Sequence, residues 1–253
     1  MLFVNQDSIV RKIWGKADTI LFIFAGSAAE FALNKAVDWL YFTGRLPADP
    51  LGRLFSTVGY SKQIIFSDEH TARAAIGKIN SIHKDVEASR GKHIPDWAYR
   101  DVLFMLIDYS VRSFELLERD LAPAEKEEVF DVFRRVGVLM EIKELPGNYA
   151  EWRKARTQHM RQDLAASKFT KDLYKQYKKR LGPVRYFILK QVQVLLVPGP
   201  VNNLLGFKPI WGFAALLKLY KLVRSFKLEN TFKSILLPSA YKAQIQELDR
   251  QSV

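Results

Sequence analysis

The sequence predicts an all-α fold in a single large helical domain, on three observations. The chain has 253 residues, of which 48% are hydrophobic, enough to bury a sizeable core. Apolar residues recur at helical spacing along most of the chain, and no run alternates apolar and polar residues between hairpin turns, as strands do. Short connectors rich in Gly, Pro and Asp separate the periodic segments.

Ten helices follow from this pattern. In chain order they are predicted at 8–25, 27–43, 50–66, 69–89, 97–119, 123–142, 148–163, 170–180, 183–196 and 210–227. Asp68 and Asp96 stand where N-caps are expected, Pro123 suits a first helical turn, and Ser167 or Thr170 begins the next helix. The Pro/Gly cluster VPGPVNN then predicts a boundary between a helical domain at 1–206 and a C-terminal helical appendage at 207–253.

Several classes of chemistry are excluded by what the chain lacks. It has no cysteine, which excludes disulfides, iron–sulfur clusters, a cysteine nucleophile and covalently attached haem. No histidine is preceded by Glu at the third position before it, as a di-iron bundle requires. The zincin motif, the G-x-S-x-G motif and the glycine-rich phosphate loops are also absent.

The net charge of +12 is concentrated in one region. Residues 151–190 hold twelve Lys or Arg against three acids, so this segment is either a solvated helix face or a surface for an anionic partner. No nucleic-acid-binding motif accompanies it, and the prediction is no nucleic acid. The stretch FKPIWGFAALLKLYKLVRSFKL is apolar on one side and basic on the other, as in an interfacial helix, which predicts peripheral membrane contact.

The expected location is cytoplasmic, with membrane association through the stretch FKPIWGFAALLKLYKLVRSFKL. The N-terminus becomes charged before any long apolar run develops, so no signal peptide is predicted. The longest uncharged apolar stretch, TILFIFAGSAA, is closed by Asp18 and Glu30. It has roughly half the length that spans a bilayer.

Acidic side chains recur on predicted helices that are otherwise apolar. Glu30, Asn34 and Asp38 are four residues apart and form a polar line on the predicted helix 27–43. This line is either a half-exposed face or a pocket wall on which an acid serves as catalytic proton acceptor. Asp108 and Glu115 repeat the pattern, and buried carboxylates of this kind need partners, for which Arg53, Arg100 or Arg112 are candidates.

His83 stands inside the apolar stripe of the predicted helix 69–89. Ala72, Ala75, Ile76, Ile79, Ile82 and Val86 share that stripe at helical spacing. A histidine there is either a core residue with a satisfied ring or the axial ligand of a b-type haem, whose porphyrin rests on apolar side chains. The other histidines, His70, His93 and His159, lie in or near charged segments and are predicted to be at the surface.

An ordered set of motifs resembles one known family. Asp49-Pro50, Arg53-Leu54 and Thr57 match the pattern D-P-x-x-R-L-x-x-T, and an Ala-rich helix ending in His83 follows it. Over roughly 17–207 the chain resembles the helical domain shared by rubber oxygenase (latex clearing protein) and the farnesyl-chain-cleaving oxygenase of mycophenolic acid biosynthesis. Rubber-cleaving members carry a lysine just before the threonine, where this chain has Ser56.

The resemblance implies a haem-dependent oxygenase with a buried haem pocket. His83 would be the axial ligand of non-covalent haem b, and Arg53 and Thr57 would lie in or beside the pocket. Glu30 or Asp38 would be the distal catalytic acid, and O2 the co-substrate for cleaving a double bond of a hydrophobic, isoprenoid-type alkene. The two alternatives are a haem-binding sensor or carrier without turnover, and a haem-free helical protein that binds anionic membrane through its basic face.

Overall fold

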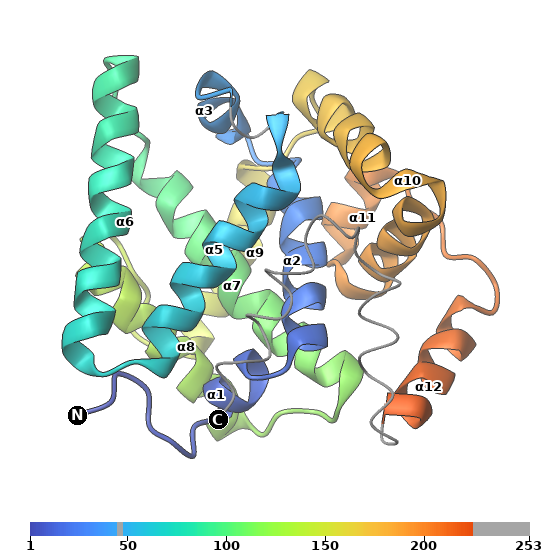
Figure 1. Ribbon diagram of the computed structural model, residues 1–253, viewed down its shortest axis with the longest axis horizontal. Coiled ribbons are helices and arrows are strands. Elements are labelled where there is room, and N and C mark those ends of the chain that lie inside the picture. The colour runs from blue at the N-terminus through green and yellow to red at the C-terminus, as the bar shows by residue number, and fades with distance from the viewer. Residues whose placement is uncertain (45–47, 225–253) are drawn as a thin grey trace.

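The computed structural model describes residues 1–44 and 48–224, and within them the chain is all-α (Figure 1). No strand occurs in this part of the chain, which confirms the predicted fold class. The helices are α1 (Ile9–Trp14), α2 (Ala17–Phe31), α3 (Val37–Phe42), α5 (Pro50–Phe66), α6 (Glu69–Arg90), α7 (Asp96–Leu117), α8 (Pro123–Leu139), α9 (Tyr149–Gln162), α10 (Lys168–Leu196), α11 (Gly199–Leu205) and α12 (Phe213–Arg224).

Side-chain caps fix several helix starts where the sequence places them. The carboxylates of Asp49 and Asp68 accept backbone N–H groups of Gly52 and Thr71, both at 3.0 Å, at the starts of α5 and α6. Each cap satisfies a backbone donor that the first helical turn leaves without a partner. The prediction for Asp96 was wrong by one position, because Pro95 precedes α7 and Asp96 is its first residue.

The N-terminal helices differ from the prediction. The expected helices 8–25 and 27–43 are replaced by α1, α2 and α3, with a turn at residues 32–36. Asn34 makes this turn, because its side-chain oxygen accepts the backbone N–H of Ala36 at 2.8 Å. Asn34 also forms an isolated β-bridge with Leu164. Asn prefers such local bonds to helical ones, so the polar line at 30, 34 and 38 does not lie on one helix.

The C-terminal half also departs from the prediction at two points. The segments 170–180 and 183–196 form one kinked helix, α10, in which Gly182 has φ +74° and Pro183 follows it. Proline lacks the N–H that a straight helix needs, and glycine tolerates a positive φ. The expected connector VPGPVNN contains a short helix, α11, which begins with Pro at its first turn and buries Val201.

The central helix of the fold is α2, which packs against α1, α7, α10 and α11 (Figure 1). Most of its residues are buried, which explains why TILFIFAGSAA is apolar on every side. None of the described helices combines the length and apolar character needed to span a bilayer.

The first part of the predicted C-terminal appendage packs on this core. Phe213, Leu217 and Tyr220 of α12 cover an apolar cluster that includes Phe22 and Val192. Tyr220 also donates a hydrogen bond to Asp18 at 2.9 Å. The division into 1–206 and 207–253 stays a prediction, and residues 225–253 lie outside the described part of the chain.

A glycine on α2 permits close contact with α7. A Cβ at Gly26 would overlap the ring of Tyr109, which is fully buried. We expect Gly26→Ala to lower the free energy of unfolding by about 1–3 kcal/mol, as overpacking does. In the matched control Gly77→Ala on α6, the new Cβ meets nothing within 4 Å. That change should raise stability by about 0.4–1 kcal/mol. Chemical denaturation of both variants checks this, and equal effects would contradict it.

Candidate functional site

The apolar stripe of α6 is not covered along its whole length. Ala72, Ala75 and Ile76 in its first half are buried, whereas Ile79, Ile82 and Val86 are only half-buried. A cavity of about 390 Å³ lies beside the second half, between α3, α5 and α6. Its lining residues are Leu40, Phe42, Thr43, Arg53, Ile82, Asp85, Val86 and Ser89.

His83 lies on α6 between lining residues Ile82 and Asp85. Its ring contacts Tyr99 of α7 at 5.0 Å between ring centroids. Its Nδ1 atom is buried and has no hydrogen-bond partner among the described residues. A buried polar atom without a partner is costly, so this ring is not the satisfied core histidine of the first interpretation. A buried ring nitrogen without a protein partner is free to interact with a bound group.

The surroundings of His83 keep its ring neutral. Burial lowers the pKa of His83 from 6.5 to about 4, with a further contribution from the positive charge of Arg53 and an opposing one from Glu87. A neutral imidazole has the free electron pair that a metal ligand needs. The ring of His83 therefore fits the role of an axial ligand at neutral pH.

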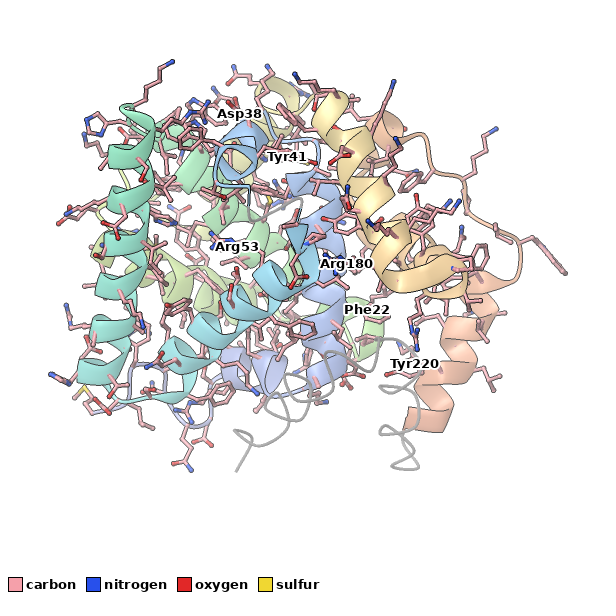
Figure 2. All side chains as sticks on the ribbon, turned by 45° about the horizontal axis from the view of Figure 1, so that its top comes forward. Phe22, Asp38, Tyr41, Arg53, Arg180 and Tyr220 are labelled. Carbon is pink, nitrogen blue, oxygen red and sulfur yellow. The ribbon has the colours of Figure 1, made fainter. Side chains whose placement is uncertain are left out.

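Arg53 connects His83 to the cavity. It projects from α5 on the side that faces α6 (Figure 2), lines the cavity, and is close enough to lower the pKa of His83. Thr57 does not line the cavity, and its hydroxyl donates to the carbonyl oxygen of Arg53 at 3.2 Å within α5. Ser56 makes the same kind of bond at 2.8 Å and is exposed. The structure thus brings Arg53 to the cavity and leaves Thr57 one turn away on the same helix.

Asp38 forms an ion pair near the cavity and does not line it. Its carboxylate lies 2.6 Å from Nη2 of Arg90, and that guanidinium stacks over the ring of Trp39 at 4.0 Å. The carboxylate among the lining residues is Asp85 instead. The sequence carried a signal for this placement, because Asp85 lies three residues after Ile82 and so on the same side of the helix.

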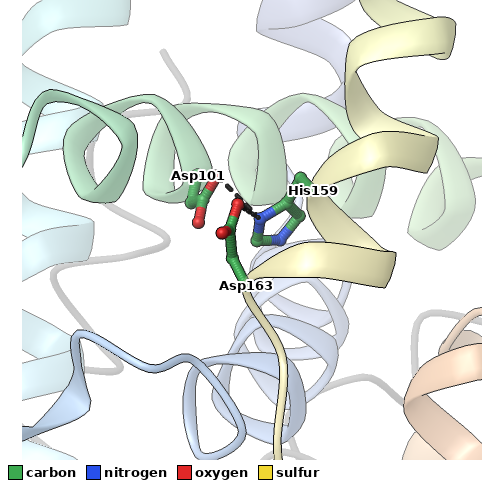
Figure 3. A group of neighbouring side chains, drawn as sticks. All are labelled: Asp101, His159 and Asp163. Atoms are coloured by element: carbon green, nitrogen blue, oxygen red, sulfur yellow. Dashed lines mark ion pairs between the residues drawn. The ribbon is translucent and has the colours of Figure 1, made fainter.

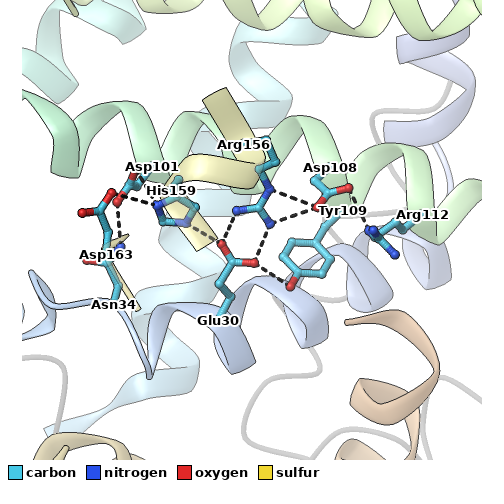
Figure 4. A network of polar contacts seen from close by, with 9 residues as sticks. All are labelled: Glu30, Asn34, Asp101, Asp108, Tyr109, Arg112, Arg156, His159 and Asp163. Atoms are coloured by element: carbon cyan, nitrogen blue, oxygen red, sulfur yellow. Dashed lines mark hydrogen bonds and ion pairs between the residues drawn. The ribbon is translucent and has the colours of Figure 1, made fainter. Parts of the chain in front are cut away.

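Glu30 is the centre of a second cluster of polar residues, which lies in the core (Figure 4). It is fully buried on α2. Both of its oxygens accept hydrogen bonds from the guanidinium of Arg156 on α9, and Oε2 also accepts the hydroxyl of Tyr109 at 2.8 Å. Burial alone would raise the pKa of Glu30, but Arg156 and His159 outweigh it and lower the pKa to about 2.

The same cluster continues along α7. Nη2 of Arg156 also donates to Asp108 at 2.9 Å, and Asp108 accepts from Arg112 one turn further on at 2.8 Å. Arg112 was one of three arginines predicted as possible partners of the buried carboxylates, and it pairs with Asp108. Together these residues join α2, α7 and α9 by charge-assisted hydrogen bonds, which are stronger than neutral ones.

His159 completes the cluster and corrects the prediction that it lies at the surface. It is 3% exposed. Its Nε2 lies 2.9 Å from Glu30, and its Nδ1 lies 2.7 Å from Asp101 and 3.4 Å from Asp163 (Figure 3). Charged neighbours in the sequence suggested exposure, but Trp152, Arg156 and His159 follow helical spacing and share a buried face.

Asp101, His159 and Asp163 are close enough together to be considered as a metal site. One ligand atom from each lies within 4.8 Å of the others. Burial alone would lower the pKa of His159, but Asp101 and Glu30 raise it to about 9. The ring is therefore protonated at neutral pH, with a carboxylate at each nitrogen. Without a metal, these residues therefore form a network of ion pairs around His159.

The two clusters allow different chemistry. The cavity offers a cation, Arg53, and a carboxylate, Asp85, beside apolar walls, and the neutral imidazole of His83 lies next in sequence to its lining residue Ile82 without lining the cavity itself. None of the members of the core cluster lines the cavity. Its fully buried Glu30 is ionised and faces Arg156 and His159, which corrects the interpretation of Glu30 as a wall of the pocket. That either Glu30 or Asp38 acts in catalysis stays a prediction.

Comparison with known proteins identifies the family of this chain. Residues 14–227 match the family model described as ER-bound oxygenase mpaB/B'/Rubber oxygenase, catalytic domain. Comparison with curated proteins and with solved structures gives no match. The match includes α2 through α12, and with them both the cavity and the buried cluster. The chain belongs to the family of mpaB and rubber oxygenase catalytic domains.

Proposed function

We propose that this protein is a haem b-dependent oxygenase that uses O2 to cleave a double bond of a hydrophobic, isoprenoid-type alkene, with His83 as the axial ligand. The family supports an oxygenase. The observation that carries the cofactor assignment is the neutral ring of His83 on α6, whose buried Nδ1 has no partner among the described residues and which is next in sequence to Ile82, a lining residue of the cavity.

The residues around the cavity suit the parts of that reaction that the protein must supply. Arg53 offers a positive charge for the anionic propionates of the cofactor. Leu40, Phe42, Ile82 and Val86 form apolar walls that favour a hydrocarbon chain over water. Asp85 is the carboxylate positioned to hold or accept a proton at the cavity.

Bound haem supplies the redox chemistry that activates O2, as cofactors do in such enzymes. Both oxygen atoms end in the products when one double bond becomes two carbonyl groups, so the cleavage needs no external reductant. The contribution of the chain is to ligate the iron through His83, to orient the cofactor through Arg53, and to exclude water from the apolar part of the cavity.

Titration with hemin tests the proposal. We expect the native protein to give a saturable Soret band, and His83→Ala to shift or abolish it. His70→Ala is the matched control, because His70 lies on the same helix and is exposed; its spectrum should equal that of the native protein. A missing band, or one that does not respond to His83→Ala, would overturn the assignment of His83.

Oxygen uptake separates turnover from simple binding. With isoprenoid alkenes the haem-loaded protein should consume O2 and form carbonyl products, while His83→Ala should not. A stable haem complex that consumes no O2 with any alkene would contradict the oxygenase and favour a haem sensor or carrier.

A further inference from the structure

One long segment of the chain carries positive charge only. From residue 173 to residue 228 there is no Asp or Glu, and the segment contains eleven cationic residues: Lys175, Lys178, Lys179, Arg180, Arg185, Lys190, Lys208, Lys218, Lys221, Arg224 and Lys227. In the described part, six of them are exposed: Lys175, Lys178, Lys179, Arg180, Lys208 and Lys218. A segment with positive charge only attracts an anionic partner, and Lys208 and Lys218 are its exposed cations between residues 184 and 219.

Large apolar side chains are exposed on the same segment. Trp211 is 100% exposed, and Ile210 beside it is 48% exposed. The other exposed large apolar residues between 184 and 219 are Val184, Phe187, Leu204, Leu216 and Leu219. The described part of the chain has only five such residues before 184, and they are scattered: Met1, Leu2, Phe42, Val102 and Val138.

Contacts join the elements that carry most of these residues. The side chain of Gln191 on α10 bonds the backbone of Ile210 at 3.0 Å and that of Lys208 at 3.5 Å. Lys190 lies over the ring of Phe207. Phe213 and Leu217 of α12 pack in the same cluster as Ile188 of α10. The second half of α10, the loop 206–212 and α12 therefore adjoin one another, as Figure 1 also shows.

We infer that this surface, formed by residues 184–219 and called the basic-apolar face, binds peripherally to an anionic lipid bilayer. Trp favours the interface between lipid and water, where its ring is partly apolar and its N–H is hydrated. Lysines that flank it place their ammonium groups among anionic headgroups while their stems lie along apolar surface. Residues Leu216 and Leu219 are three apart on α12 and share a side of that helix.

The apolar part of the face favours a bilayer over a nucleic acid. Phosphates alone would explain the lysines, but exposed Val, Ile and Leu side chains have no counterpart in a nucleic-acid backbone, whereas they gain free energy on entering a lipid interface. This inference does not depend on the proposed oxygenase activity, because it concerns residues that do not line the cavity.

Flotation of the full chain with vesicles tests the inference. We expect binding to phosphatidylcholine vesicles that contain about one third phosphatidylserine, weak binding to pure phosphatidylcholine, and release by salt. The double variant Lys208→Glu/Lys218→Glu should weaken binding about tenfold or more, since each juxtamembrane cation contributes substantially. The matched control is Lys78→Glu/Lys84→Glu on α6, where both side chains are exposed. This control changes the net charge equally and should lose much less binding than Lys208→Glu/Lys218→Glu.

Tryptophan emission gives a second, local measurement. Addition of anionic vesicles should shift the emission of the native protein to shorter wavelength, and Trp211→Phe should remove that shift while circular dichroism stays unchanged. Absence of binding to anionic vesicles would overturn the inference, as would an equal loss in the α6 control or a shift that persists in Trp211→Phe. Binding of an oligonucleotide in preference to vesicles would also overturn it and favour a nucleic acid.

Discussion

Replacing Arg156 by methionine is expected to lower the free energy of unfolding by about 3–5 kcal/mol, because it leaves buried charges without a partner. Arg156 is 3% exposed and contacts both Glu30 and Asp108. Methionine fills similar space, so the loss reports the charge and the hydrogen bonds rather than a cavity. Urea denaturation followed by circular dichroism measures it.

The control for this variant is Arg119→Met. Arg119 pairs with Glu125 at 2.7 Å, but its side chain is 58% exposed, and exposed pairs contribute about 0–1 kcal/mol. The double variant Glu30→Gln/Arg156→Met should regain part of the stability lost in Arg156→Met, since it also removes the stranded carboxylate charge. An Arg156→Met protein as stable as Arg119→Met would show that the buried network contributes nothing to folding.

The stability of the protein is expected to fall as the pH rises from about 6 to about 9.5, because His159 loses its proton. Asp101 and Glu30 raise the pKa of His159 from 6.5 to about 9 in the folded protein, against the effect of burial. The folded state then binds the proton more tightly than the unfolded state. Its contribution is therefore complete below pH 6.5 and is lost as the pH rises through about 9.

Glu30 has the opposite dependence. Its pKa falls from 4.5 to about 2 on folding, so its contribution is present above pH 4.5 and is lost as the pH falls toward 2. His83 adds a loss in acid, because its folded pKa of about 4 lies below the usual 6.5 and the unfolded chain takes up the proton first. Stability is therefore expected to fall at high pH through His159 and at low pH through Glu30 and His83.

Thermal unfolding of His159→Gln isolates the contribution of this one residue. The variant should unfold at a lower temperature than the native protein near pH 6, by roughly 5–10 °C, since 1 kcal/mol moves Tm by about 2–4 °C in a chain of this size. The difference should shrink toward pH 9.5. Parallel profiles for the two proteins would contradict the assignment of a protonated His159 between Glu30 and Asp101.

Local sequence signals predicted the helices that begin and end with clear chemistry. Helix α5 has the predicted bounds 50–66, because Asp49 caps it and Pro50 suits its first turn, and α6 begins after the cap Asp68 as predicted. His83 was placed on the apolar stripe of α6 by periodicity alone. These features depend on residues that are near one another in the chain, so a single sequence contains the information.

The same local rules failed where distant residues decide the structure. Asn34 looked like one point of a polar line, but its bonds to Ala36 and the bridge to Leu164 turn the chain. His159 looked exposed because its neighbours in sequence are charged. Its actual partners are Glu30, 129 residues away, and Asp101.

The sequence by itself determined that this protein is helical, that its apolar central segment is helical although it was divided at residue 26, and that a histidine stands on the apolar side of α6. Only the tertiary structure decided which acids face the cavity and which are paired with cations in the core. The physical reason is that the pKa and the role of a carboxylate depend on which charges lie within a few ångströms of it. Packing of α2, α7 and α9 brings Arg156 and His159 to Glu30, and leaves Asp85 at the cavity.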